Sequence, residues 1–458
     1  MAASVSGLRA YVIVWAGQFL SLLGSSLTGF ALGVFVFQVT GSVATLAAIF
    51  TLSLLPSIVA TPFAGSLVDR WGTKRSLVVS NLANTLISVV LAALLLTGAF
   101  EVWQVYLIVV ASSLVAALEI PAFVSLAPQL VPKRHLGRIN GMRMSAIATS
   151  GVLAPALGGF LLLAIGLEGI VLIDLASFIP VMLALWLVRI GRVAAPADAA
   201  APGTRSLWSE AGDGWRYIVA RPGLLALLLF LGAINFNAAF LDLLITPLVL
   251  SFGSASTLGV VLSVGAIGMV LTGVVLSVWG GPRRKVRGVL WFSALLAPAT
   301  VLGAVRPNPV LIAVAAFVFM GAFGIVVATN QAIWQTKVEQ HLMGRVVAIV
   351  NMVSQIPQLI AYAVAGVTVD RVLAPLVGRD EVRSPALAAV IGDGPGRAIA
   401  LMVLIVGVLI VVSVALAVSS PRLRRLEDEL PDAPGLDGSS PPPPGPEPPA
   451  YEPVAGRT

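Results

Sequence analysis

The sequence predicts an all-α membrane protein with twelve transmembrane helices in two bundles of six. The 458 residues are 58% hydrophobic and only 11% charged, whereas soluble domains carry about 25% charged residues. Apolar runs recur between short polar turns along most of the chain. A helix needs about 20 residues to cross a bilayer, and each run is long enough to do so. Loop motifs also repeat at a nearly constant offset, which divides the chain into two halves.

The expected spans fall into two groups of six that a polar interval separates. The first six lie at about 11–38, 43–66, 76–98, 102–123, 140–164 and 168–189. The second six lie at about 223–250, 256–279, 287–305, 308–329, 344–371 and 397–419. We therefore expect an N-terminal bundle over residues 1–190, a cytoplasmic central loop over 191–221 and a C-terminal bundle over 222–420.

The last segment, residues 421–458, is polar and ends in the proline-rich run 441–446. A segment of this composition has too little apolar surface to form a core, so we expect a disordered cytoplasmic tail. Its composition leaves open whether the tail binds another protein or is only solvated.

The basic residues indicate the orientation. With both termini in the cytoplasm, 23 of the 28 lysines and arginines lie on the cytoplasmic side, and Arg306, Arg371, Arg379, Arg383 and Arg397 remain outside. This distribution satisfies the positive-inside rule. It predicts a multi-pass protein of the cell membrane. It also explains the net charge of +7, because basic loops orient the protein in the lipid bilayer, and nucleic-acid binding is not needed to account for them.

The composition leaves little material for enzymatic chemistry. The chain has no cysteine and two histidines that are not at helical spacing, so disulfides, thiolate catalysis and a metal site have no support. None of the four lysines follows a glycine, so a phosphate-binding loop is absent from the sequence. We expect neither an enzyme nor a cofactor, and we expect any energy source to be an ion gradient, that of protons.

The loop motifs repeat between the two halves. The pattern Gly65-x3-Asp69-x-Trp71-Gly72 matches Gly273-x3-Ser277-x-Trp279-Gly280 at an offset of 208, and His135-Leu136-Gly137-Arg138 matches the segment 341–345. Gly159 then corresponds to Gly366. Matched loops at a common offset predict two halves related by an axis along the membrane normal, an arrangement found in transporters.

One polar turn, residues 65–75, is central to the interpretation. It contains two glycines, an aspartate and three cations between two apolar runs: Gly65, Asp69, Arg70, Gly72, Lys74 and Arg75. The glycines permit close helix crossing, and the charges need one another near hydrocarbon. The turn resembles the loop 2–3 signature of the major facilitator superfamily, with Thr73 where that family usually has a basic residue.

A second motif supports this resemblance. Residues 154–159 include Pro155, Gly158 and Gly159 and follow Gly141, which is similar to the antiporter motif of facilitator exporters, although Ala154 replaces its first glycine. The segments 17–25 and 330–335 resemble the twelve-helix drug:proton antiporter branch, which includes macrolide and siderophore exporters. The resemblance covers about residues 9–420 and implies the major facilitator fold, secondary transport and export. The fourth span lacks the arginine found in many proton-coupled members.

In the facilitator fold that the resemblance supplies, loop 2–3 lies beside the start of the eleventh helix, here at Gly344 and Arg345. A helix N-terminus carries unpaired N–H groups and partial positive charge, so Asp69 is suited to hold it when the cytoplasmic side is closed. The matching Ser277 brings no charge and predicts a weaker contact.

Polar residues within the spans are the candidates for chemistry. Asp242 is mid-span, where a carboxyl group is costly and suited to carry a proton, although helix-helix hydrogen bonding is an equal alternative. Glu119 is a second proton-coupling candidate, for which snorkelling to the membrane surface or pairing with Arg138 or Arg143 is the competing interpretation. We expect Asp174 at the membrane interface. The substrate-cavity candidates are the amides Gln18, Asn235, Asn237, Asn330, Gln331, Asn351 and Gln355.

The sequence therefore predicts a monomeric, proton-coupled exporter of hydrophobic or amphiphilic small molecules, drug-, macrolide- or siderophore-like, that works by alternating access and contributes to drug resistance. An uptake symporter for a small organic solute and a membrane receptor without transport activity are the alternatives. Charged substrate-binding residues would favour the symporter, and they are sparse. The internal repeat argues against the receptor.

Overall fold

A computed structural model describes residues 7–132, 135–188, 215–377 and 394–430, and within these ranges the regular structure is entirely helical. The long helices of the first half are α1 (Leu8–Thr40), α2 (Val43–Trp71), α3 (Thr73–Leu96), α4 (Val102–Leu130) and α5 (Leu136–Leu187). Those of the second half are α7 (Pro222–Leu250), α8 (Ala255–Trp279), α9 (Lys285–Val305), α10 (Pro309–Lys337), α11 (Gln340–Val367) and α14 (Arg397–Ser419).

Among the described residues, 11 helices are long and apolar enough to cross a membrane. One of them, α5, has 52 residues and is interrupted at Gly166, whose φ of 71° and ψ of −177° are not helical. Glycine tolerates this conformation because it has no Cβ. The chain reverses there, so α5 supplies the fifth and sixth predicted spans and the all-α fold with twelve spanning segments is confirmed.

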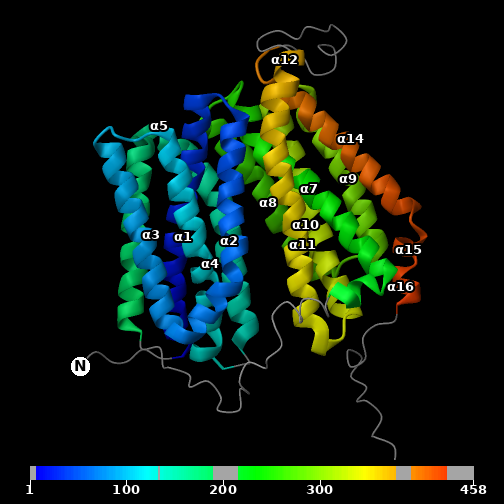
Figure 1. Ribbon diagram of the computed structural model, residues 1–458, viewed down its shortest axis with the longest axis horizontal. Helices are drawn as coiled ribbons and strands as arrows, with labels where there is room; N and C mark the ends of the chain where they lie inside the picture. The colour runs from blue at the N-terminus through cyan, green and yellow to red at the C-terminus, as the bar shows by residue number, and fades with distance from the viewer. Residues whose placement is uncertain (1–6, 133–134, 189–214, 378–393, 431–458) are drawn as a thin grey trace, which may run out of the picture.

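The helices form two bundles that repeat one packing pattern, as Figure 1 shows with α1–α5 on one side and α7–α14 on the other. In the first bundle α1 packs on α5, and α4 packs on α2 and α3. In the second, α7 packs on α11, and α10 packs on α8 and α9. The bundles meet through α5 with α8 and α2 with α11, so the interface itself has two equivalent halves.

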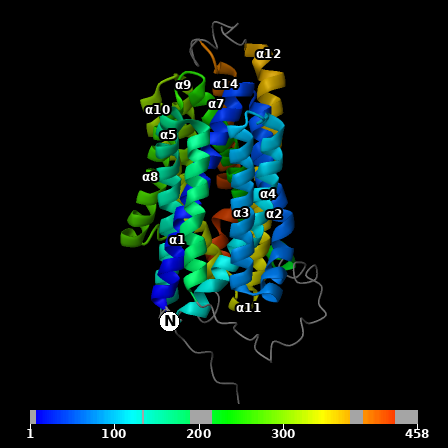
Figure 2. The ribbon, with the colours of Figure 1, turned by 90° about the vertical axis from the view of Figure 1, so that its left-hand side faces the viewer.

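The two bundles share a terminal face and an opposite face. The terminal face holds the start of α1 at Leu8 and the end of α14 at Ser419, and the opposite face holds the short helix α12 (Ala374–Val377). Both views place the start of α1 and α12 at opposite ends of the molecule (Figures 1 and 2).

The structure corrects the predicted start of the tail. Residues 421–429 form two short helices, α15 (Pro421–Arg424) and α16 (Leu426–Glu429), in which Leu423 and Leu426 are buried. The Glu427 carboxylate accepts the backbone N–H of Lys285 at 2.7 Å, so it caps the start of α9. Residues 421–430 therefore belong to the folded C-terminal bundle, because two leucines are buried there and one glutamate caps a helix. The rest of the predicted tail lies outside the described residues.

The end of the predicted central loop is packed as well. Ile218 is fully buried in the core of the second bundle, and the Tyr217 hydroxyl donates to the Lys337 carbonyl at 3.3 Å. Residues 189–214 of this loop lie outside the described part of the chain.

Candidate functional site

The bundles contact each other tightly at the opposite face, and the antiporter-like motif lies in that contact. A Cβ on Gly159 would lie 2.5 Å from the Ala255 carbonyl oxygen of α8, and a Cβ on Gly259 would collide with the Pro155 carbonyl. Close by, the Ser263 hydroxyl donates to the Val152 carbonyl at 2.6 Å. Small residues here allow backbone contact between α5 and α8.

The repeat places a second contact of the same kind between α11 and α2. A Cβ on Gly366, the counterpart of Gly159, would lie 2.5 Å from the Ala44 Cα. Gly158 has a different partner, because a Cβ there would lie 2.7 Å from the Phe30 ring of its own bundle.

One charged side chain reinforces the second contact. Asp370 lies in a π-helical segment, Thr368–Leu373, that continues α11. Its carboxylate accepts the Ser42 hydroxyl and the Ala44 N–H, both at 2.8 Å, and the Val43 N–H at 3.3 Å. It therefore caps the start of α2 in the other bundle, where unpaired N–H groups and the helix dipole favour an anion.

At the terminal face the equivalent glycines are not at helix crossings. In the part of the chain that the structure describes, Gly65 on α2, Gly141 on α5 and Gly273 on α8 have no atom within 4 Å of the position that a Cβ would occupy. The described residues therefore do not form the close crossing predicted at Gly65 in this conformation. The bundles approach at the opposite face, and these three terminal-face glycines are free of the partner bundle.

The 65–75 turn is as short as the sequence predicts. One residue, Gly72, with φ of 82° and ψ of 149°, separates α2 from α3. Lys74 Nζ donates to the Val188 carbonyl at 2.8 Å, so it ties the turn to the end of its own bundle, and Arg70 and Arg75 are exposed. The side chains of Asp69 and Arg345, and the surroundings of Gly344, lie outside the described part.

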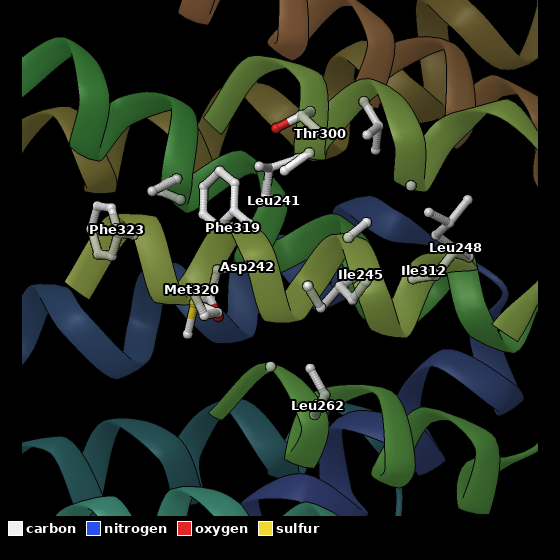
Figure 3. A pocket seen from close by; sticks show the side chains of 18 of the residues that line it. Leu241, Asp242, Ile245, Leu248, Leu262, Thr300, Ile312, Phe319, Met320 and Phe323 are labelled. Atoms are coloured by element: carbon white, nitrogen blue, oxygen red, sulfur yellow. The ribbon is translucent and has the colours of Figure 1, made fainter. Parts of the chain in front are cut away.

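A cavity of about 330 Å³ lies inside the second bundle, between α7, α8, α9, α10, α11 and α14. Asp242 is the one charged residue among the described residues that line it, and Figure 3 shows it among Ile245, Phe319 and Met320. The Tyr362 hydroxyl donates to Asp242 Oδ2 at 2.7 Å and accepts the Gln358 amide at 2.9 Å.

Asp242 is thereby connected to the interface between the bundles. The Tyr362 ring makes an edge contact with Phe50 of α2, with centroids 5.2 Å apart. A change in the charge of Asp242 acts directly on its hydrogen bond with Tyr362, and Tyr362 touches the other bundle. The arrangement can therefore connect a protonation event to helix packing.

A second cavity, about 610 Å³, lies inside the first bundle and holds more polar groups. Glu119 lies there with its two oxygens bonded by amides: Gln18 Nε2 donates to Oε1 at 3.2 Å, and Asn84 Nδ2 donates to Oε2 at 2.9 Å. Amide partners therefore take the place of the predicted alternative partners Arg138 and Arg143. Gln18, one of the substrate-cavity candidates, lines this cavity as well.

The interfacial position predicted for Asp174 is wrong. Its side chain is 2% exposed, and it accepts the Ser25 hydroxyl at 3.1 Å and the Ser88 hydroxyl at 2.9 Å. The residue also lines the 610 Å³ cavity. Three helices supply these groups, and because hydroxyl partners hold the carboxyl group inside the bundle, it does not reach the interface.

The other cavity candidates divide into two groups. Asn235 lines the 330 Å³ cavity as predicted, together with Gln358. The residues that line neither cavity are Asn237, Asn330, Gln331, Asn351 and Gln355. Asn237 is buried on the packed side of α7 and donates to the Ala233 carbonyl, whereas Gln331 and Asn351 are exposed. Each side chain on a helix points in one direction, and that direction depends on how the helix packs. A polar residue within a span therefore lines a cavity only when its side of the helix faces that cavity.

Sequence reasoning missed Tyr362, Asn84, Ser88 and Asp370 as site residues. Tyr362 stands four residues after Gln358, a spacing that places both on one helix face, so this pairing was readable in the sequence. The Ser88 contact joins residues 86 apart in the sequence, and the Asp370 contacts join residues 326–328 apart. No local sequence pattern predicts contacts over such separations.

Comparisons with known proteins agree with this architecture. The model of the family described as "Major Facilitator Superfamily" matches residues 14–362. Macrolide efflux protein A of Streptococcus pyogenes is 23% identical over 366 residues, which cover 79% of this chain and 90% of the relative. The multidrug efflux pump Tap of Mycobacterium tuberculosis is 25% identical over 380 residues, which cover 79% of this chain and 87% of the relative.

Solved structures match the fold at lower identity. A bacterial homologue of the human lysosomal transporter Spinster, inward-facing and unoccupied, has a TM-score of 0.66 at 14% identity, with 89% of this chain and 95% of that chain covered. The nucleoside transporter NupG has a TM-score of 0.65 at 13% identity, with coverage of 90% and 100%.

Proposed function

Because the chain belongs to the major facilitator superfamily, we propose that this multi-pass membrane transporter is a proton-coupled exporter of hydrophobic or amphiphilic small molecules. Two relatives bear the names of a macrolide efflux protein and a multidrug efflux pump. The antiporter-like residues Pro155 and Gly159 at the contact between the bundles support the same direction. The names supply a substrate class of drug-like molecules.

The basic residues supply the orientation. By the positive-inside rule the terminal face is cytoplasmic, and the opposite face is on the outside. The contacts of Gly159, Gly259, Gly366 and Asp370 then close the outer side. The conformation is inward-facing, the state in which an exporter loads substrate from the cytoplasm or inner leaflet.

The observation that carries the coupling proposal is the Asp242–Tyr362 hydrogen bond within a mostly apolar cavity. An ionisable group inside a membrane bundle is costly and marks a pathway for ions or substrates. Protonation of Asp242 would neutralise the carboxylate to which the Tyr362 hydroxyl donates its hydrogen bond. The packing of Tyr362 on Phe50 gives that event a route to the other bundle.

The apolar lining supports a substrate that is mostly hydrophobic. Around Asp242 the cavity presents Phe319, Met320 and Phe323, and aromatic and thioether side chains adapt to varied ligands. Asn235 and Gln358 supply the polar contacts that would orient a ligand.

Transport in inside-out membrane vesicles tests the proposal, with ethidium, erythromycin and enterobactin as probes. An imposed proton gradient, acidic inside, should drive probe accumulation, and a protonophore should abolish it. ATP without a gradient should have no effect. Accumulation that persists with the protonophore and requires ATP would refute proton coupling. Proton-driven probe movement in the reverse direction would establish an uptake symporter instead.

A further inference from the structure

We infer that Asp174, held by Ser25 and Ser88 beside Thr28, is a second proton-binding site, in the first bundle, and that it rather than Glu119 changes protonation during transport. The inference rests on the proposed proton-coupled function for its role. Its physical content, a carboxyl group that exchanges a proton inside the bundle, stands on the geometry of the cluster alone.

The cluster lies at the meeting point of three helices. Asp174 comes from the second part of α5, Ser25 and Thr28 from α1, and Ser88 from α3. All four residues line the 610 Å³ cavity, so a proton or water inside that cavity can reach them. Asp174 is 2% exposed and Ser88 is 6% exposed, which makes the site buried and yet connected.

The partners of Asp174 suit both forms of a carboxyl group. A hydroxyl carries one donor and two acceptor lone pairs. Ser25 and Ser88 donate to the two carboxylate oxygens when Asp174 is charged. After protonation, rotation of a hydroxyl hydrogen is enough for a serine to accept the new O–H, so no side chain has to move.

Glu119 has partners of a different kind. Gln18 and Asn84 direct amide N–H groups at its two oxygens, and an amide nitrogen donates but does not accept. After protonation of Glu119, the amide that faces the protonated oxygen would have to rotate about its side chain to offer its own oxygen instead. The surroundings of Glu119 therefore favour one form, the carboxylate, whereas those of Asp174 allow two.

Thr28 supplies the acceptor that the protonated form needs. Its side chain is 8% exposed, and its Oγ1 has no hydrogen-bond partner among the described residues. The same hydroxyl faces the Asp174 carboxyl group. A buried polar atom without a partner is costly, and a proton on Asp174 would give this oxygen one.

The backbone beside the cluster is shaped to leave it room. A Cβ on Gly24 would lie 2.9 Å from Asp174 Oδ1 and 2.6 Å from the Ser177 hydroxyl. The other charged residues that line the cavity are Glu119 of α4 and Arg143 of α5. Because Glu119 is held by amides and Arg143 is not among the bonded partners of Asp174, the hydroxyls are the direct partners of this group.

Infrared difference spectroscopy of the full chain in lipid, between high and low pH, tests the inference without any substrate. A protonated carboxyl group absorbs through its carbonyl stretch, which the carboxylate lacks. The parent for comparison is Asp242→Asn, so that the other cavity carboxyl is silent. In this background Asp174→Asn should remove a pH-dependent carbonyl band, and Glu119→Gln should leave that band unchanged.

Thr28→Val and Ser88→Ala keep the inference testable if Asp174→Asn does not insert. Each should shift the frequency of the band, because each removes a hydrogen bond to the group that absorbs. A band that survives Asp174→Asn, disappears in Glu119→Gln or ignores both hydroxyl changes would overturn the assignment. Because no transport is measured, a failure of proton-driven export would leave this result intact, and the two failures are distinguishable.

Discussion

Removal of the Asp370 carboxylate should open the outer side of the transporter. On the opposite face, which the proposed orientation makes the outer side, this group accepts three hydrogen bonds from the start of α2, at 2.8, 2.8 and 3.3 Å. The contact joins the two bundles, so it stabilises only the conformation in which they touch there. Asp370→Asn and Asp370→Ala should therefore shift the population from inward-facing to outward-facing.

The size of the shift follows from the geometry. An acidic group at a helix N-terminus stabilises by about 0.3–1 kcal/mol when exposed and up to about 2 kcal/mol when partly buried. Asp370 is partly exposed, so we expect about 1–2 kcal/mol, which is about a 5- to 30-fold change in the ratio of the two states. Asparagine keeps a neutral acceptor at roughly half the bond strength, so Asp370→Asn should fall at the low end and Asp370→Ala at the high end.

Cysteine labelling measures this shift because the chain contains no cysteine. Ser263 is 7% exposed and lies in the contact between α5 and α8, so Ser263→Cys is a reporter that becomes accessible when the outer side opens. A membrane-impermeant maleimide added outside should react faster in the Asp370 variants by the factors given above. The reporter itself weakens one hydrogen bond, but it does so equally in every variant.

Glu168→Gln is the matched control. It removes one negative charge on the same side, at an exposed residue near the turn at Gly166, without touching the other bundle in the described contacts. If Asp370→Ala labels no faster than Glu168→Gln, the carboxylate does not hold the outer side closed and the reasoning is refuted.

Three further predictions follow from the sites above. The Asp242→Asn variant should still insert and bind the probe, because an amide keeps a hydrogen bond with Tyr362. It should lose proton-driven accumulation in vesicles, because an amide cannot release a proton. Normal accumulation would show that Asp242 has no role in proton coupling. Truncation after residue 430 should leave transport unchanged, whereas truncation after 425 should lower the melting temperature. The shorter chain loses the Leu426 side chain, whose burial stabilises by about 1.5–3 kcal/mol. Equal melting temperatures would contradict this. Asp69→Asn should slow transport and favour the inward-facing state more than Ser277→Ala does, because the Ser277 hydroxyl bonds only to the Val274 carbonyl of its own helix in the described contacts. Equal labelling of cytoplasmic cysteine reporters in both variants would show that Asp69 does not hold the cytoplasmic side closed.

The candidate site was only partly readable from the sequence. Gln18, Glu119, Asp242 and Asn235 were identified because polar groups within a span are costly wherever they point, and all four line cavities. Asn237 and Gln331 satisfied the same criterion and line neither cavity, because the rotation of a helix about its axis is set by packing. The position of Asp174 was wrong for a related reason: distance along the span was considered, but not the hydroxyls on neighbouring helices.

The sequence by itself determined the class of the protein, the number of its spans and the position of its sharpest turns. Span length follows from bilayer thickness, and turns at Gly72 and Gly166 follow from the one residue type that adopts their backbone angles easily. The repeat motifs also determined that two similar bundles would form. These properties depend on local chain chemistry and on the solvent.

Only the tertiary structure decided which groups meet. The Asp370 cap on α2, the Asp242–Tyr362 bond and the hydroxyl cluster around Asp174 join segments 86 to 328 residues apart. The ordered start of the tail is of the same kind, because Glu427 and Leu426 have partners only at the starts of α9 and α7, which lie far from them in the sequence. In a bundle of nearly uniform apolar helices, small differences in rotation and crossing select these contacts, and such differences leave no local signature in the sequence.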